Sequence, residues 1–92
     1  MDKTIYTREY AALLRLLRSK RVKSGVNQVD LAEGLGIHQS SYSKLERGER
    51  RIDVIQLRNI VELIGGSLPE FVTELEKAIS SSKASRKSSR RK

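Results

Sequence analysis

Residues 28–48, QVDLAEGLGIHQSSYSKLERG, decide the fold of this chain. They read as two short helices joined by a tight turn, because apolar residues recur at helical spacing on both sides of Gly36. Those apolar residues are Val29, Leu31, Leu35, Ile37, Tyr42 and Leu45. Helices this short cannot bury their own faces, so we expect close packing, which the small side chain of Ala32 permits. Gly36 falls where the first helix must stop, at a turn that usually needs a positive φ.

Such a pair predicts a helix-turn-helix, in which the second helix enters the major groove of DNA. The exposed side chains near the start of that helix would then reach base edges. We expect these to be Gln39, Ser40, Ser41, Ser43 and Lys44. Gln39 can pair both amide groups with adenine, and Lys44 can donate to guanine acceptors. For each of them the alternative is an ordinary solvated side chain.

Residues 13–64 resemble the XRE-like helix-turn-helix family, the fold of lambdoid phage repressors and Cro proteins. The resemblance rests on Gln28 opening a helix, the LAEGLGI turn, the LERGERR exit and an amphipathic segment that ends in glycine. It implies a lambda-repressor-like DNA-binding fold. It also places Gln39, Ser40 and Lys44 at the family's main base-contacting positions.

The resemblance further implies two roles at the DNA backbone. Gln28 matches a residue that anchors its helix to a phosphate and supports the first reading residue, and Arg47 matches a phosphate-contacting position. From the residues themselves we add Lys23, His38, Arg50 and Arg51 as phosphate neighbours. The alternatives are that Lys23, with Arg21, complements a helix dipole, that His38 is a surface cap, and that the arginines are merely solvated.

Two residues of the helix that follows Gly36 are expected to face inward. We expect the ring of Tyr42 to pack in the core and its hydroxyl to find a polar partner. A carboxylate facing DNA would be repelled, so we expect Glu46 to form an internal ion pair that orients an arginine. Arg15 and Arg47 are the candidate partners.

The net charge of +8 is unevenly distributed. Residues 8–52 hold ten Lys/Arg and five Asp/Glu, residues 53–82 hold two and five, and residues 83–92 hold six basic and no acidic side chains. Positive charge therefore surrounds the helix-turn-helix and the C-terminal segment, which favours salt-dependent binding to a polyanion. The alternative is that surplus basic residues keep a small domain soluble.

The sequence predicts an all-α, compact five-helix bundle with helices at residues 8–22, 28–35, 39–47, 54–64 and 68–79. Thr7, Asn27 and Asp53 are expected N-caps, and Ser67 begins a capping box. Residues 1–79 would form the DNA-binding domain. Residues 80–92 would be a disordered basic tail, because they bury too little apolar surface to offset the entropy of ordering. The tail either contacts phosphates without regard to sequence or is simply solvated.

The last predicted helix carries an apolar stripe that is wide for so small a bundle. Part of it packs in the core, and part is expected to pair with a second copy. The expected dimer residues are Phe71, Val72, Leu75 and Ile79. A twofold dimer would present two reading helices one DNA turn apart and would require a palindromic operator.

The composition argues against several function classes. One histidine, no cysteine and no carboxylate cluster leave no expected catalytic or metal site, cofactor or small-molecule substrate. No apolar run approaches the roughly 18 residues that span a bilayer, and basic residues interrupt the N-terminus, so we expect no membrane segment and no signal peptide. We expect a cytoplasmic, nucleoid-associated bacterial or phage transcription regulator, most simply a repressor. The alternative is an antitoxin or other interaction module that binds DNA only with a partner protein.

Overall fold

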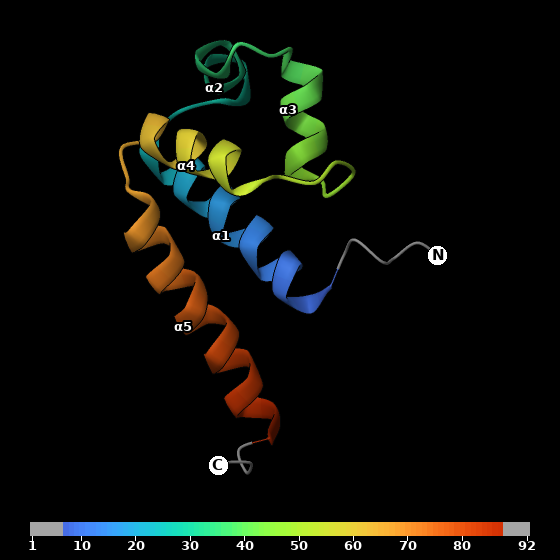
Figure 1. The fold of residues 1–92 in the computed structure, drawn as a ribbon, viewed down its shortest axis with the longest axis vertical. Coiled ribbons are helices and arrows are strands. Elements are labelled where there is room, and N and C mark those ends of the chain that lie inside the picture. The colour runs from blue at the N-terminus through green and yellow to red at the C-terminus, as the bar shows by residue number, and fades with distance from the viewer. Residues whose placement is uncertain (1–6, 88–92) are drawn as a thin grey trace.

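The computed structural model of the chain describes residues 7–87, and the side chains of residues 7–81. This part of the chain contains five α-helices and no strand (Figure 1). The helices are α1 (Arg8–Ser24), α2 (Gln28–Leu35), α3 (Gln39–Glu46), α4 (Val54–Leu63) and α5 (Leu68–Lys87). The predicted fold class is confirmed.

Side-chain caps set the starts of four helices, as the sequence predicted. Thr7 accepts a hydrogen bond from the backbone N–H of Tyr10 (3.1 Å), and Asn27 accepts one from Asp30 (2.8 Å). The Asp53 carboxylate accepts from the N–H of Gln56 (2.7 Å), and the Ser67 hydroxyl accepts from Glu70 (3.4 Å). Each cap satisfies a donor that the first helical turn leaves without a partner.

Gly36 makes the sharp turn between α2 and α3. Its φ is +75°, in the left-handed region, and its N–H donates to the carbonyl of Glu33 (3.1 Å). The N–H of Ile37 then donates back to Ala32 (3.0 Å). A Cβ at Gly36 would meet nothing within 4 Å, so the backbone conformation, and not a lack of space, requires glycine here.

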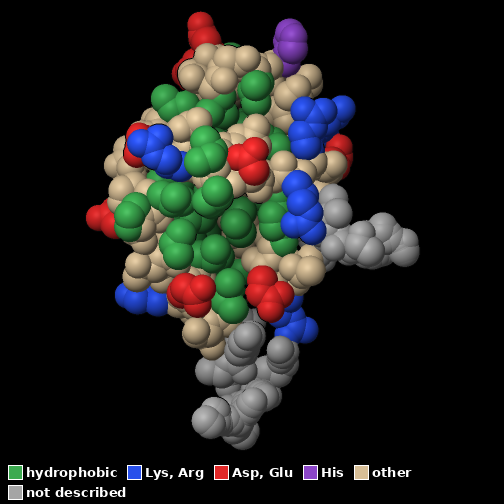
Figure 2. All heavy atoms as spheres, in the orientation of Figure 1, with side chains coloured by type: hydrophobic (Ala, Val, Ile, Leu, Met, Phe, Trp, Pro, Cys, Tyr) green, Lys and Arg blue, Asp and Glu red, His purple; other side chains and the backbone are tan. Residues whose placement is uncertain are grey.

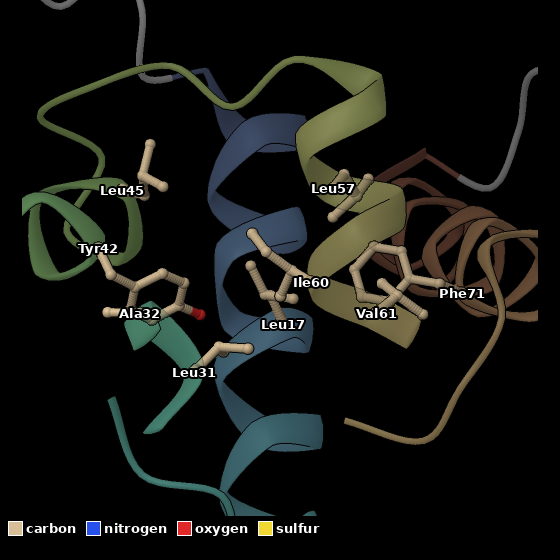
Figure 3. Packing of buried hydrophobic residues seen from close by; sticks show 9 residues of the cluster. All are labelled: Leu17, Leu31, Ala32, Tyr42, Leu45, Leu57, Ile60, Val61 and Phe71. Carbon is tan, nitrogen blue, oxygen red and sulfur yellow. The ribbon is translucent and has the colours of Figure 1, made fainter. Parts of the chain in front are cut away.

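The core draws side chains from all five helices (Figure 3). Leu17 of α1 and Ile60 of α4 are fully buried at its centre, with α2 and α3 on one side and α5 on the other. The complete set is Leu17, Leu31, Ala32, Tyr42, Leu45, Leu57, Ile60, Val61 and Phe71. Ala32 is 1% exposed at the contact between α2 and α3, as the expected close packing requires.

Helix α5 differs from its prediction at the C-terminal end. It runs beside α1 and then extends beyond the other helices (Figure 1). We expected it to end near Ile79 and a disordered tail to follow, but the helix continues to Lys87. No glycine or proline stops it, and the alanine, lysine and arginine residues that follow are good helix formers. The rest of the predicted tail, residues 88–92, lies outside the described residues.

Among the helices described, none is long and apolar enough to cross a membrane.

Candidate DNA-binding surface

Helix α3 lies on the outside of the molecule, with a buried apolar face and an exposed polar one (Figure 1). Tyr42 and Leu45 point into the core, at 0% and 1% exposure. On the opposite side, the expected base-contacting residues Gln39, Ser40 and Lys44 are exposed, and Ser41 and Ser43 are partly exposed. The exposed side of α3 therefore presents one glutamine, three serines and one lysine.

The side chain of Gln39 is held by a hydrogen bond that it donates to the preceding helix, α2. Its Nε2 donates to Oε1 of Gln28, at 2.9 Å. The Nε2 of Gln28 donates in turn to Oε1 of Glu46, also at 2.9 Å. The side chain of Gln28 therefore bridges the first exposed residue of α3 and a carboxylate at the end of the same helix.

Glu46 forms the expected internal ion pair, but with Arg21 and not with Arg15 or Arg47. The Arg21 Nε lies 2.6 Å from Oε2 of Glu46, and Nη2 lies 3.2 Å from Oε1. The two side chains are only 10% and 4% exposed. A third guanidinium nitrogen, Nη1, donates to the carbonyl of Val26 (3.1 Å). The pair fastens α3 to α1 and to the loop before α2.

The spacing of Arg21 along α1 is a sequence signal for this pair. Arg21 follows Leu14 and Leu17 at spacings of seven and four, so it lies on the buried face of α1. We had grouped it with the exposed basic residues at the end of that helix. A basic residue in register with an apolar stripe indicates a buried partner of opposite charge.

Burial alone would raise the pKa of Glu46, but hydrogen bonds from Arg21, Tyr42 and Gln28 outweigh it and lower that pKa below its ordinary value. The hydrogen bond to Glu46 raises the pKa of Arg21. Both groups are therefore charged at neutral pH.

Tyr42 occupies its expected place, with its ring in the core and its hydroxyl at a polar edge (Figure 3). The hydroxyl donates to Oε2 of Glu46, at 2.7 Å. Burial first, and the hydrogen bond to Glu46 second, raise the pKa of Tyr42 well above its ordinary value. The phenol therefore stays protonated and remains a donor.

Arg47, an expected phosphate contact, is exposed just after α3 and makes local ion pairs. Its Nε and Nη2 lie 2.9 Å and 3.1 Å from the Glu49 carboxylate, and its Nη1 donates to the hydroxyl of Ser43. Ser43 is thus engaged with Arg47 in the free protein, whereas we had expected it to face bases.

Three of the remaining expected phosphate contacts flank α3, but Lys23 lies at the end of α1, where it lines a pocket with residues of the α4–α5 connection. His38 is exposed at the N-cap of α3, where no side-chain hydrogen bond caps the helix, and Lys23 is exposed in the last turn of α1. Arg50 and Arg51 are exposed after α3. The guanidinium of Arg51 lies 5.2 Å from the ring centre of Tyr10, within the range of a cation–π contact.

The expected dimer residues divide into two groups. Phe71 is 1% exposed and belongs to the core, so its assignment to a partner surface is wrong; docking of α5 onto α4 buries it. Val72 is 40% exposed, and Leu75 and Ile79 are partly exposed along the same helix. Figure 2 shows apolar side chains gathered on the face formed by α1, α4 and α5.

A helix-turn-helix family profile matches residues 17–71, more than half of the chain. Among solved structures, an XRE-family like protein from Pseudomonas syringae pv. tomato str. DC3000 is 41% identical, with a TM-score of 0.75. The match covers 82% of this chain and 92% of that one. The chain belongs to the XRE family of helix-turn-helix proteins.

Two structures of the clp gene regulator ClgR from Corynebacterium glutamicum are also similar to this XRE-family chain. One is 26% identical with a TM-score of 0.73, covering 87% of this chain and 85% of that one. The other is 28% identical with a TM-score of 0.68, covering 78% and 94%. A comparison with curated proteins found no match. The family profile runs from the middle of α1 to the first turn of α5, and so includes the whole Arg21–Glu46 network.

Proposed function

We propose that this XRE-family protein is a sequence-specific transcription regulator, most simply a repressor, that binds a palindromic operator as a homodimer. The observation that carries the proposal is the exposed polar face of α3, which a network of hydrogen bonds, running from the buried Arg21–Glu46 pair to the surface, fastens to α1 and α2. A reading helix must keep its side chains in a fixed register with the base edges. This arrangement supplies that rigidity without covering the face itself.

In this proposal Gln39, Ser40 and Lys44 make the main base contacts, and Ser41 makes a shorter-range one. Gln39, Ser40 and Lys44 are exposed, so their side chains can enter a groove while Gln39 keeps its bond to Gln28. Ser43 first orients Arg47, because its hydroxyl is already bonded to that guanidinium. It reaches a base only if Arg47 turns toward a phosphate.

Backbone contacts would come from both ends of the helix-turn-helix. Before α3 they come from Gln28, Lys23 and His38, and the N-terminus of α2 adds N–H groups that favour an anion. After α3 they come from Arg47, Arg50 and Arg51. Glu49 pairs with Arg47 in the free protein and would be exchanged for a phosphate on DNA. Such contacts set affinity and salt dependence but carry no base preference.

The partner in the proposed dimer is a second copy of the chain. Val72, Leu75 and Ile79 lie three, four and seven residues apart, so they form one partly exposed stripe along α5. This stripe lies on α5, the helix whose C-terminal part extends beyond the other helices (Figure 1). Pairing of two such stripes would bury them and relate the two α3 helices by a twofold axis.

The proposal is tested by selecting bound duplexes from a random pool with the wild-type protein, with Gln39→Ala and with Gln56→Ala. We expect the wild type to select a symmetric motif with half-sites about one helical turn apart. Gln39→Ala should lose preference at one position of each half-site, by about 1–3 kcal/mol for a bidentate contact. Gln56→Ala removes an amide from α4 and should leave the motif unchanged.

Two outcomes would contradict the proposal. If Gln39→Ala weakened binding to all sequences equally, Gln39 would not read a base. If the wild type bound no duplex at low ionic strength unless a second protein accompanied it, the interaction-module alternative would replace a self-sufficient regulator.

A further inference from the structure

Glu46 is a buried carboxylate that can only accept hydrogen bonds. Its side chain is 4% exposed, and Arg21, Tyr42 and Gln28 all donate to it. Arg21 has no acceptor to offer in return. The carboxylate has no proton to give while it is ionised, and three donors together with the neighbouring positive charge keep it so.

This fixes the direction of every hydrogen bond that leads from Glu46 to the surface. Gln28 must turn its NH₂ group toward Glu46, at 2.9 Å, so its carbonyl oxygen points the other way. That oxygen can only accept, so Gln39 must turn its own NH₂ group inward, also at 2.9 Å. An amide alone can be flipped without changing its shape, but here the carboxylate at the end of the series allows one orientation.

We propose that Glu46 is a positioning residue for base recognition: acting through Gln28, it fixes which end of the Gln39 amide faces the DNA. This inference rests on the proposed function, because it assumes that Gln39 reads a base. With its NH₂ held by Gln28, Gln39 presents its carbonyl oxygen and its second N–H outward. One acceptor beside one donor matches adenine, which offers N6–H as donor and N7 as acceptor. A flipped amide would exchange these two groups, so that its N–H faces the N6–H of adenine and its oxygen faces N7; the match to adenine is then lost, whereas the N–H can donate to O6 of guanine.

Glu46→Gln reverses this series of bonds while keeping its length. Arg21 Nε and the Tyr42 hydroxyl both donate to Oε2, so the new carbonyl oxygen takes that position, and only the longer bond from Arg21 Nη2 to Oε1 is lost. The new NH₂ group then faces Gln28 at the former Oε1 position. Gln28 would turn its oxygen inward and its NH₂ toward Gln39, and Gln39 would flip in its turn. The base preference should therefore move away from adenine and toward guanine.

The experiment uses the whole chain and the duplex that the wild type selects. Two versions of that duplex carry adenine or guanine at the position where Gln39→Ala loses its base preference. Affinities for the two duplexes are measured at one salt concentration. We expect the wild type to prefer adenine by about tenfold or more, the range of a bidentate contact. Glu46→Gln should reduce this ratio to about threefold or less, or invert it, while preferences at other positions stay within about twofold of the wild type.

Tyr42→Phe is the matched control, because it removes one donor to Glu46 and leaves the carboxylate and the path through Gln28 intact. It should lower stability but keep the adenine preference. Gln28→Leu is the second variant, needed in case Glu46→Gln does not fold. Gln28 is partly exposed and outside the core, so this variant should fold, and its loss of the acceptor should also reduce the adenine-to-guanine ratio.

The inference is overturned if Glu46→Gln, or Gln28→Leu where the first does not fold, keeps the full wild-type ratio. It is also overturned if Tyr42→Phe changes the ratio as much as Glu46→Gln, because loosening of α3 would then explain both. Failure of the proposed function has a different signature: the wild type itself would show no position that depends on Gln39.

Discussion

Helices α3 and α5 both expose one side, but the two sides are built in opposite ways. On α3 the exposed side is polar. Behind it, the Glu46 carboxylate accepts hydrogen bonds from α1, from α2 and from Tyr42 of α3 itself. On α5, Phe71 is anchored in the core, and partly exposed apolar side chains follow it along a helix that extends past its neighbours. A surface that distinguishes bases needs fixed donors and acceptors, whereas a surface that pairs with a second copy needs apolar area.

Substitutions behind the α3 surface and substitutions on the α5 stripe should also affect different free energies. The network behind α3 contains a buried ion pair, whose desolvation offsets much of its attraction. Its net contribution to folding is therefore small, but leaving one partner alone in the interior is costly. The stripe on α5 is partly exposed in the monomer, so its polar substitution should affect association more than folding.

The largest expected effect follows from breaking the ion pair behind α3. Arg21→Met keeps a similar apolar stem but leaves the Glu46 carboxylate buried without its charged partner. We expect the free energy of unfolding to fall by about 3–5 kcal/mol. Chemical denaturation followed by circular dichroism measures it.

Lys20→Met is the control, because Lys20 forms a half-exposed ion pair with Glu74 at 3.0 Å. Its loss should cost no more than about 1 kcal/mol. Equal losses in the two variants would show that burial of the Arg21–Glu46 pair has no special weight.

Protonation of Glu46 in acid should lower the free energy of unfolding by a smaller amount. Because the folded-state pKa of Glu46 is lowered, its contribution is fully present above the unfolded-state pKa and is lost as pH falls through the folded-state pKa. The loss should be smaller than in Arg21→Met, since a protonated carboxyl still accepts hydrogen bonds. Denaturation from pH 6 down to pH 3 measures it. The curve for Glu46→Gln, which cannot titrate there, should fall less steeply than that of the wild type; parallel curves would contradict the assigned ion pair.

A substitution in the α5 stripe should weaken dimerisation without changing the structure of α3. Val72→Lys places a charge in the apolar stripe at each half of a twofold dimer. The dimer dissociation constant should rise about tenfold or more, as expected for loss of a buried aliphatic side chain. Sedimentation equilibrium measures it, with Thr73→Lys as the control that adds the same charge at an exposed neighbour on another side of the helix. A wild type that stays monomeric, both free and on DNA, would remove the dimer from the account.

The features that could be predicted from sequence are those set by neighbouring residues. Asn27, Asp53 and Gly36 fixed helix boundaries correctly, because a cap or a left-handed turn depends on a few adjacent residues. The sequence predicts too early an end for α5, because residues 80–92 bury little apolar surface, but the helix continues to Lys87. Low hydrophobicity alone does not end a helix.

What could not be predicted depends on how distant elements pack. The register of Arg21 on the apolar face of α1 indicates a buried acidic partner, but only the crossing of α1 and α3 shows that this partner is Glu46, 25 positions away. Phe71 lies on an apolar stripe that serves first of all as core, and only the docking of α5 shows that this residue belongs to the core and not to the partner surface to which we assigned it. The pairing of Ser43 with Arg47 likewise depends on where the chain turns after α3.

The central claim is that the Gln39 amide reads one base edge in the major groove, and a single-atom change on the DNA tests it most directly. Replacing the adenine opposite Gln39 by 7-deazaadenine removes the N7 acceptor and leaves Watson–Crick pairing intact. We predict that this substitution weakens binding of the wild type about two- to tenfold, as expected for half of a bidentate contact of about 1–3 kcal/mol. It should leave binding of Gln39→Ala nearly unchanged. Equal losses for both proteins would mean that Gln39 and N7 are not in contact, and would contradict the account.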